Sequence, residues 1–120
     1  YEGLGFAYQG KGDGDNAFRS FNKAFRLDST RHKAGYELAG LYFKSDFADE
    51  AARRMKKVLE TQPKNANYWH ALGLAYISIG TAQTDAMAAE AFAKSVELEP
   101  KNAPYLRDLA NAQTAIAQYK

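Results

Sequence analysis

The sequence contains no cysteine, only two histidines and only three prolines among its 120 residues. Without cysteine it has no disulfide, no thiolate nucleophile and no cysteine-ligated zinc, and either the cytoplasm or the periplasm suits such a chain. No apolar run approaches the roughly 18 residues that a membrane helix needs, so we expect no membrane insertion. Sixteen basic and fourteen acidic side chains leave a net charge of +2. Because this charge is too small to attract a polyanion, we expect no nucleic-acid partner.

Motifs for catalysis and metal binding are also missing. Neither His32 nor His70 stands at a motif spacing from a serine or the other histidine, and the chain has no H-E-x-x-H, Walker or G-x-S-x-G sequence. The glycine-rich, acidic run at 10–16 lacks the closing glutamate of a calcium loop, so we interpret it as a turn followed by a helix cap. We therefore expect no enzyme activity, no cofactor and no metal ion.

What the sequence does contain is an internal repeat. Each unit has a leucine followed by a small residue and, four positions after the leucine, a tyrosine. These pairs recur at intervals of 34 residues, as Leu4 and Tyr8, Leu38 and Tyr42, and Leu72 and Tyr76. The tetrapeptide at 63–66 returns at 100–103, which is 37 residues later. The third unit therefore has three extra residues, which we place within 80–85.

Within each unit the apolar pattern is helical. Trp69, Leu72, Gly73 and Tyr76 fall at i, i+3, i+4 and i+7, which puts them on one face of a helix. Each unit then breaks near a glycine or aspartate, and a second helical pattern follows. Asn65 and Asn102 each precede an apolar stripe and are expected to cap the helix that follows. The pattern predicts seven helices, at 1–10, 15–28, 31–44, 47–61, 65–79, 84–98 and 102–118.

A 34-residue helix pair with these landmarks resembles the tetratricopeptide repeat. The third unit matches that family best, with Trp69, Leu72, Gly73, Tyr76, Ala88, Phe92, Ser95 and Pro100. The resemblance implies an all-α, right-handed superhelical array of antiparallel helix pairs, an α-solenoid. We expect a single domain with repeats at about 1–31, 32–65 and 66–102 and a capping helix at about 103–120. We also expect this domain to be a fragment of a larger protein.

Packing explains why these residue types recur. The small residue after each repeat leucine should let the two helices of a unit approach closely, while the leucines and tyrosines should be buried. Gly35 stands where the family usually has a large residue, and we expect a gap there.

A second stripe on each first helix is the candidate binding surface. The resemblance implies that this stripe lines the concave groove in which the family binds peptides. It assigns to that groove Phe6, Gln9, Lys33, Tyr36, Phe43, Lys44, Asn67, His70, Leu74, Ile77, Arg107 and Asn111. A solvated stripe should be polar, whereas several of these residues are large and apolar, which indicates an interaction surface. The alternative is that some of them pack against neighbouring first helices or against residues that precede Tyr1.

These observations predict a non-catalytic scaffold that binds a partner peptide or helix. The family's chaperone-binding subtype grips a carboxylate with lysine and asparagines, but Glu2, Phe6 and Gly40 stand at those positions. Two further hypotheses stay open, a carbohydrate- or polymer-binding segment of a secretion or assembly system and a structural spacer. The basic cluster at 53–57 lies on a second helix, and we interpret it as a solvated face.

Overall fold

The computed structural model describes residues 1–118, and within that range it contains seven α-helices and no strand. They are α1 (Glu2–Gly10), α2 (Gly14–Leu27), α3 (His32–Lys44), α4 (Ala48–Thr61), α5 (Ala66–Ile79), α6 (Ala82–Leu98) and α7 (Ala103–Ala117). Every boundary lies within two residues of the range predicted from the apolar pattern. The all-α class is therefore confirmed. Positions 119 and 120 of the predicted capping segment lie outside the described residues.

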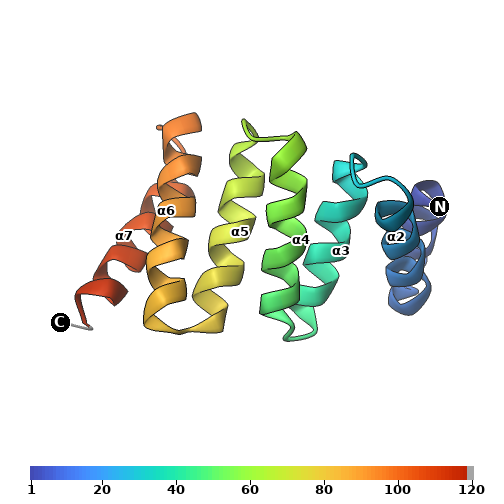
Figure 1. Cartoon of the computed structure of the whole chain (residues 1–120), viewed down its shortest axis with the longest axis horizontal. Coiled ribbons are helices and arrows are strands. Elements are labelled where there is room, and N and C mark those ends of the chain that lie inside the picture. The colour runs from blue at the N-terminus through green and yellow to red at the C-terminus, as the bar shows by residue number, and fades with distance from the viewer. Residues whose placement is uncertain (119–120) are drawn as a thin grey trace. The chain divides into compact units, whose positions relative to one another are not determined.

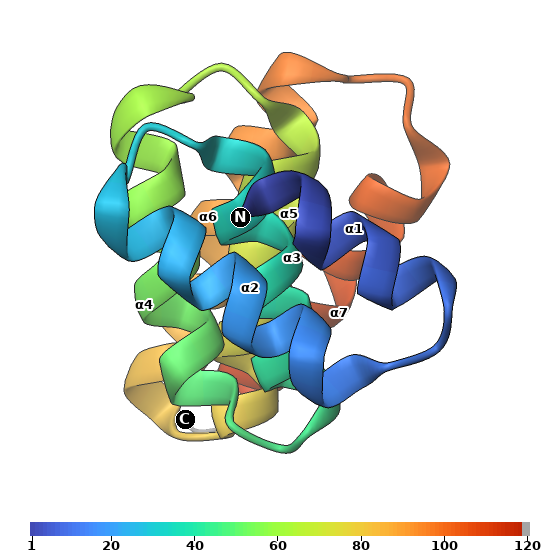
Figure 2. The same cartoon turned by 90° about the vertical axis from the view of Figure 1, so that its right-hand side faces the viewer.

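The helices form two compact units, unit 1 at residues 1–62 and unit 2 from residue 63 onward. In unit 1, α1 pairs with α2 and α3 pairs with α4, and α2 also packs on α3. Figure 2 looks onto the α1–α2 pair of this unit. In unit 2, α5 and α6 form an antiparallel pair, and α7 packs against α6 (Figure 1).

Two helix pairs are closed by an aromatic ring that lies over a glycine. Phe92 of α6 covers Gly73 of α5, and a Cβ placed on that glycine would be only 2.5 Å from the ring. Phe21 of α2 covers Gly5 of α1 with the same 2.5 Å approach. Both rings are buried. The close approach that the sequence predicted at the small repeat residue is therefore confirmed in these two pairs.

One of the leucines predicted to be buried is exposed. The prediction holds for Leu38, Leu72 and Tyr76, whereas the tyrosines at 8 and 42 are half-buried. Leu4 is 52% exposed, so the prediction is wrong there. The reason is the number of neighbouring helices: α3 is packed between α2 and α4, but α1 packs mainly on α2.

The expected gap at Gly35 is also absent. Gly35 is buried, and a Cβ there would lie 2.5 Å from Val58 Cγ2 of α4 and 2.6 Å from Phe25 Cε1 of α2. Side chains from the helices on both sides of α3 fill the space that a large residue would occupy. The glycine therefore allows tight packing within unit 1 rather than leaving a cavity.

The three extra residues of the third unit lengthen α6, which has 17 residues against 14 in α2 and α4. Ala88 is the seventh residue of α6, whereas its repeat equivalents Ala17 and Ala51 are the fourth residues of their helices. The addition is thus almost one turn at the start of α6, inside the segment that the repeat spacing predicted. Phe92 stays buried beyond it.

The predicted helix caps are present. The side chains of Asn65 and Asn102 each accept a hydrogen bond from the amide three residues later, at 3.1 and 3.3 Å. Asp13 caps α2 in the same way and accepts from Asn16 N at 3.2 Å. Hydrogen bonds from the side chain and backbone of Asn16 lower the pKa of Asp13. The turn-and-cap interpretation of the run at 10–16 is therefore confirmed.

Asp46→Gly should stabilise unit 1. The turns after α1, α3 and α5 each place one residue at positive φ, namely Gly12 (77°), Asp46 (67°) and Gly80 (80°). A left-handed conformation costs a residue with a side chain roughly 1 to 2 kcal/mol. Glycine avoids that cost but adds about 0.4 to 1 kcal/mol of unfolded-state entropy. We expect a net gain of about 0.5 kcal/mol in urea denaturation.

The same substitution at Asp49 is the matched control. Asp49 lies in the first turn of α4, where a carboxylate is favourable and glycine is a poor helix former. Asp49→Gly should therefore lower the free energy of unfolding. A loss of stability in both variants would contradict the assignment of strain to Asp46.

Candidate partner-binding surface

Half of the predicted groove residues lie in unit 1. Phe6 and Gln9 are on α1, and Lys33, Tyr36, Phe43 and Lys44 are on α3. The two lysines and Gln9 are exposed, and Tyr36 is half-buried. Phe6 and Phe43 are exposed by 39% and 38%, which is high for phenylalanine. The predicted apolar residues of unit 1 therefore reach the surface.

The backbone of α3 is open to solvent between two aromatic residues. Tyr36, Gly40 and Phe43 fall at i, i+4 and i+7, so they share one side of the helix. A Cβ added to Gly40 would meet nothing within 4 Å, so the backbone is open there. Lys33 and Lys44 lie one turn or less beyond the two ends of this stretch. We call these five residues the α3 face.

The two predicted groove residues on α1 make contacts within unit 1. Gln9 Nε2 donates a hydrogen bond to Glu37 Oε2 of α3 at 2.7 Å. Phe6 packs edge-on against Phe21 of α2, with ring centroids 5.0 Å apart. Gln9 thus links the two first helices of unit 1, and Phe6 contributes to the α1–α2 packing as well as to the surface.

The other predicted groove residues lie in unit 2. Asn67, His70, Leu74 and Ile77 are on α5, and Arg107 and Asn111 are on α7. Asn67, Arg107 and Asn111 are exposed, whereas the apolar pair on α5 is half-buried. The exposed groove residues of unit 2 are therefore polar, whereas those of unit 1 include two phenylalanines.

His70 is engaged within unit 2. Its Nε2 lies 2.7 Å from Asp108 Oδ2 of α7, and both side chains are largely shielded from solvent. The imidazole ring packs on Tyr105, with 4.6 Å between centroids, and on Phe92, with 5.5 Å between centroids. His70 thus holds α7 to α5, and a ligand would have to compete with Asp108 for it.

Sequence reasoning missed the two carboxylates that link first helices. Glu37 and Asp108 each stand one residue before a repeat leucine, Leu38 or Leu109, so they occupy the same repeat position. Each lies within hydrogen-bond distance of a side chain from the preceding first helix of its unit. Their shared repeat position is the feature of the sequence that could have identified these two carboxylates.

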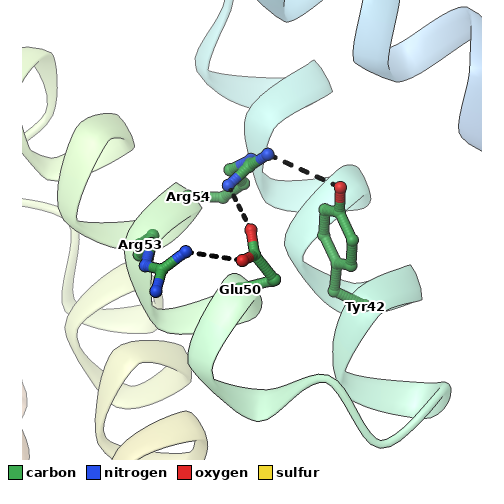
Figure 3. A network of polar contacts seen from close by, with 4 residues as sticks. All are labelled: Tyr42, Glu50, Arg53 and Arg54. Atoms are coloured by element: carbon green, nitrogen blue, oxygen red, sulfur yellow. Dashed lines mark hydrogen bonds and ion pairs between the residues drawn. The ribbon is translucent and has the colours of Figure 1, made fainter.

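Three cations of the basic cluster on α4 are paired with carboxylates of the same helix. Glu50 accepts hydrogen bonds from Arg53 at 2.5 Å and from Arg54 at 2.8 Å (Figure 3). The Arg54 guanidinium also lies 5.1 Å from the centre of the Tyr42 ring. These contacts support its interpretation as an ordinary solvated face.

Two kinds of site do not occur within residues 1–118. No group of three or more histidine, aspartate or glutamate side chains in this range is placed to hold a metal ion. None of the helices there has the length and apolar character required to span a bilayer.

Comparisons with known proteins agree with the repeat pattern. A family model described as "Tetratricopeptide repeat" matches residues 8–75. The fold is similar to that of MamA, with 22% identity, 98% of this chain and 67% of that chain covered, and a TM-score of 0.86. It is also similar to the first tetratricopeptide domain of Spaghetti (RPAP3) bound to the HSP90 peptide SRMEEVD, at 20% identity, 97% and 92% coverage and a TM-score of 0.82. These likenesses confirm the helical-repeat solenoid fold.

A shorter match occurs with a curated protein from Salmonella typhimurium (strain LT2), "Outer membrane porin protein OmpD". Identity is 39% over 77 residues, which cover 62% of this chain and 21% of that protein. The chain thus spans about a fifth of the length of the curated relatives it matches.

Proposed function

Because the chain belongs to the tetratricopeptide repeat family, we propose that it is a non-catalytic scaffold that binds a peptide or helix of a partner protein on its first helices. The observation that carries this proposal is the α3 face. Tyr36 and Phe43 flank an open backbone position at Gly40, and a lysine stands beyond each end. Partly exposed aromatic side chains on either side of an open backbone position are suited to apolar anchors of a peptide.

Structural neighbours support a peptide as the class of partner. The Spaghetti domain is bound to an HSP90 peptide, and the second tetratricopeptide domain of human RPAP3 is in complex with the HSP70 peptide SGPTIEEVD. We do not extend those ligands to this chain, because Glu2, Phe6 and Gly40 replace the lysine and asparagines of the carboxylate-gripping pattern. Nothing in the family or its neighbours favours a polysaccharide, and we do not propose one.

The α3 face also suggests how a ligand would divide its contacts. Apolar side chains of the bound peptide would cover Tyr36 and Phe43, and the peptide backbone would approach α3 most closely at Gly40. Lys33 and Lys44 would orient acidic or carbonyl groups at the ends. Exposed ion pairs contribute about 0 to 1 kcal/mol, whereas truncating an aromatic anchor costs about 2 kcal/mol, so the aromatics should supply most of the affinity.

A double substitution of the aromatics tests this function. With a partner segment identified by pull-down and synthesised as a peptide, Tyr36→Ala combined with Phe43→Ala should weaken its affinity at least ~30-fold. Circular dichroism should show little change in helix content, because neither side chain is fully buried. Isothermal titration calorimetry measures the affinity.

Two further variants separate binding from folding. Gly40→Leu should place a side chain over the open backbone between Tyr36 and Phe43 and so block the peptide. It should also favour the helix, because leucine is a better helix former by about 0.8 kcal/mol. Replacing Arg53 and Lys57 by glutamine on α4 should leave binding almost unchanged. If the α4 variant loses binding and the α3 variants keep it, the working surface lies on the second helices and the proposal is wrong.

A further inference from the structure

The exposed side of α2 carries every basic residue of that helix. Arg19, Lys23 and Arg26 follow one another at intervals of four and three residues, and all three are exposed. The opposite side is buried in unit 1 and consists of Ala17, Ser20, Phe21, Ala24 and Phe25. At 1.5 Å per residue, the three cations span about 10 Å along the axis. We call them, together with the half-buried Asn22 between them, the α2 strip.

These cations lack local neutralisation. Within the described chain, no carboxylate lies within ion-pair distance of Arg19, Lys23 or Arg26. The Lys23 ammonium lies 4.6 Å from the centre of the Tyr1 ring, which leaves its charge in place. Arg19 contributes only the smallest of the effects that lower the pKa of Asp13. The strip therefore presents three unpaired positive charges to solvent.

The repeat equivalents of two of these cations, on α4, are paired with carboxylates. Arg53 and Lys57 occupy the repeat positions of the first two cations of the strip. There, Arg53 is paired with Glu50 at 2.5 Å and Lys57 with Glu60 at 3.5 Å. In α6 the position of Arg53 holds Glu90. Helix architecture alone therefore does not require the unpaired charges of α2.

We propose that the α2 strip docks an acidic segment of a partner protein, at a surface separate from the α3 face. Carboxylates on alternate residues of an extended peptide lie about 6.7 Å apart, close to the roughly 6 Å rise between Arg19 and Lys23. A guanidinium at each end of the strip can bind a carboxylate with two parallel hydrogen bonds. An acidic tail with a glutamate at every second position fits this surface.

Charge and burial favour a peptide over other anionic partners. Basic segments that bind anionic lipid usually have about four to eight cations, and amphipathic helices insert an apolar side. The strip has three cations, and the apolar side of α2 is buried in the core of unit 1. A net charge of +2 for the whole chain also falls short of the positive field of a nucleic-acid-binding domain.

A designed acidic peptide tests the proposal directly. The probe is fluorescein-labelled Glu-Ser-Glu-Ser-Glu-Ser-Glu, and its counterpart has glutamine at each glutamate. Fluorescence anisotropy at low ionic strength should show binding of the acidic peptide alone. Affinity should fall as salt is added. The combination of Arg19→Gln, Lys23→Gln and Arg26→Gln should weaken binding at least ~10-fold.

A control variant removes the same charge from another helix. Arg53→Gln, Lys56→Gln and Lys57→Gln should change the affinity less than ~2-fold. Tyr36→Ala with Phe43→Ala should bind the acidic peptide normally, so this test is independent of the peptide-scaffold proposal. Equal losses in the two charge variants would reduce the effect to net charge and overturn the inference. It would also be overturned if wild type failed to bind the peptide, or bound anionic vesicles or an oligonucleotide more tightly.

Discussion

Replacing Phe92 by alanine should lower the free energy of unfolding by about 3 to 5 kcal/mol. Phe92 is only 2% exposed, and its ring covers Gly73 and packs against the His70 ring. Because Gly73 has no side chain, it cannot fill the cavity that truncation of Phe92 would leave above it. The loss should appear in urea denaturation followed by circular dichroism, with an unchanged dependence on urea concentration.

The same substitution at Phe47 provides the control. Phe47 is 53% exposed, and its ring forms a T-shaped pair with Tyr42, with centroids 6.4 Å apart. Phe47→Ala should therefore cost less than about 1 kcal/mol. A loss of the same small size for Phe92→Ala would show that the α5–α6 register described above is wrong.

The features that the sequence predicted well depend on local chemistry or on spacing. Asn65 caps α5 because its own side chain reaches an amide three residues away, which no distant residue can prevent. The extra turn of α6 follows from the change in repeat spacing from 34 to 37 residues. The close contact at Gly73 follows from a small residue recurring at one position of a helix pair. Each of these three features can be predicted from the order of residues alone.

The features that the sequence did not predict depend on which side chains from different helices contact one another. Leu4 has the repeat pattern of Leu38, yet its exposure is set by the number of helices that pack on α1. Gly35 looked like a gap because Phe25 and Val58, from two other helices, could not be placed beside it. The repeat pattern contained no signal for either of these two contacts.

The candidate binding residues also divide into those that the sequence could identify and those that required the structure. Tyr36 and Phe43 could be found from the sequence, because large apolar residues on a side that should be polar stand out. His70 was selected by the same position rule, but its pairing with Asp108 requires knowing that α7 packs beside it. The α2 strip was overlooked because Arg19 resembles Arg53 in sequence, and only ion-pair distances separate the unpaired from the paired cation.

Gly73→Ala and Gly40→Ala should change stability in opposite directions. Both glycines are inside helices, where alanine is favoured by about 1 kcal/mol. At Gly40 the new methyl group meets nothing within 4 Å, so Gly40→Ala should raise the free energy of unfolding by about that amount. It serves as the matched control for the substitution in the core.

At Gly73 the methyl carbon would lie 2.5, 2.6 and 3.0 Å from three atoms of the Phe92 ring. Overpacking costs about 1 to 3 kcal/mol, and because the Phe92 ring is only 2% exposed, we expect Gly73→Ala to lie at the upper end. After the helix-propensity gain, we expect a net loss of about 2 kcal/mol in urea denaturation. Adding Phe92→Leu should make the Gly73→Ala change less costly, because leucine is smaller than the ring. If Gly73→Ala were stabilising, Phe92 could move aside, and the small residue would not be what sets the distance between α5 and α6.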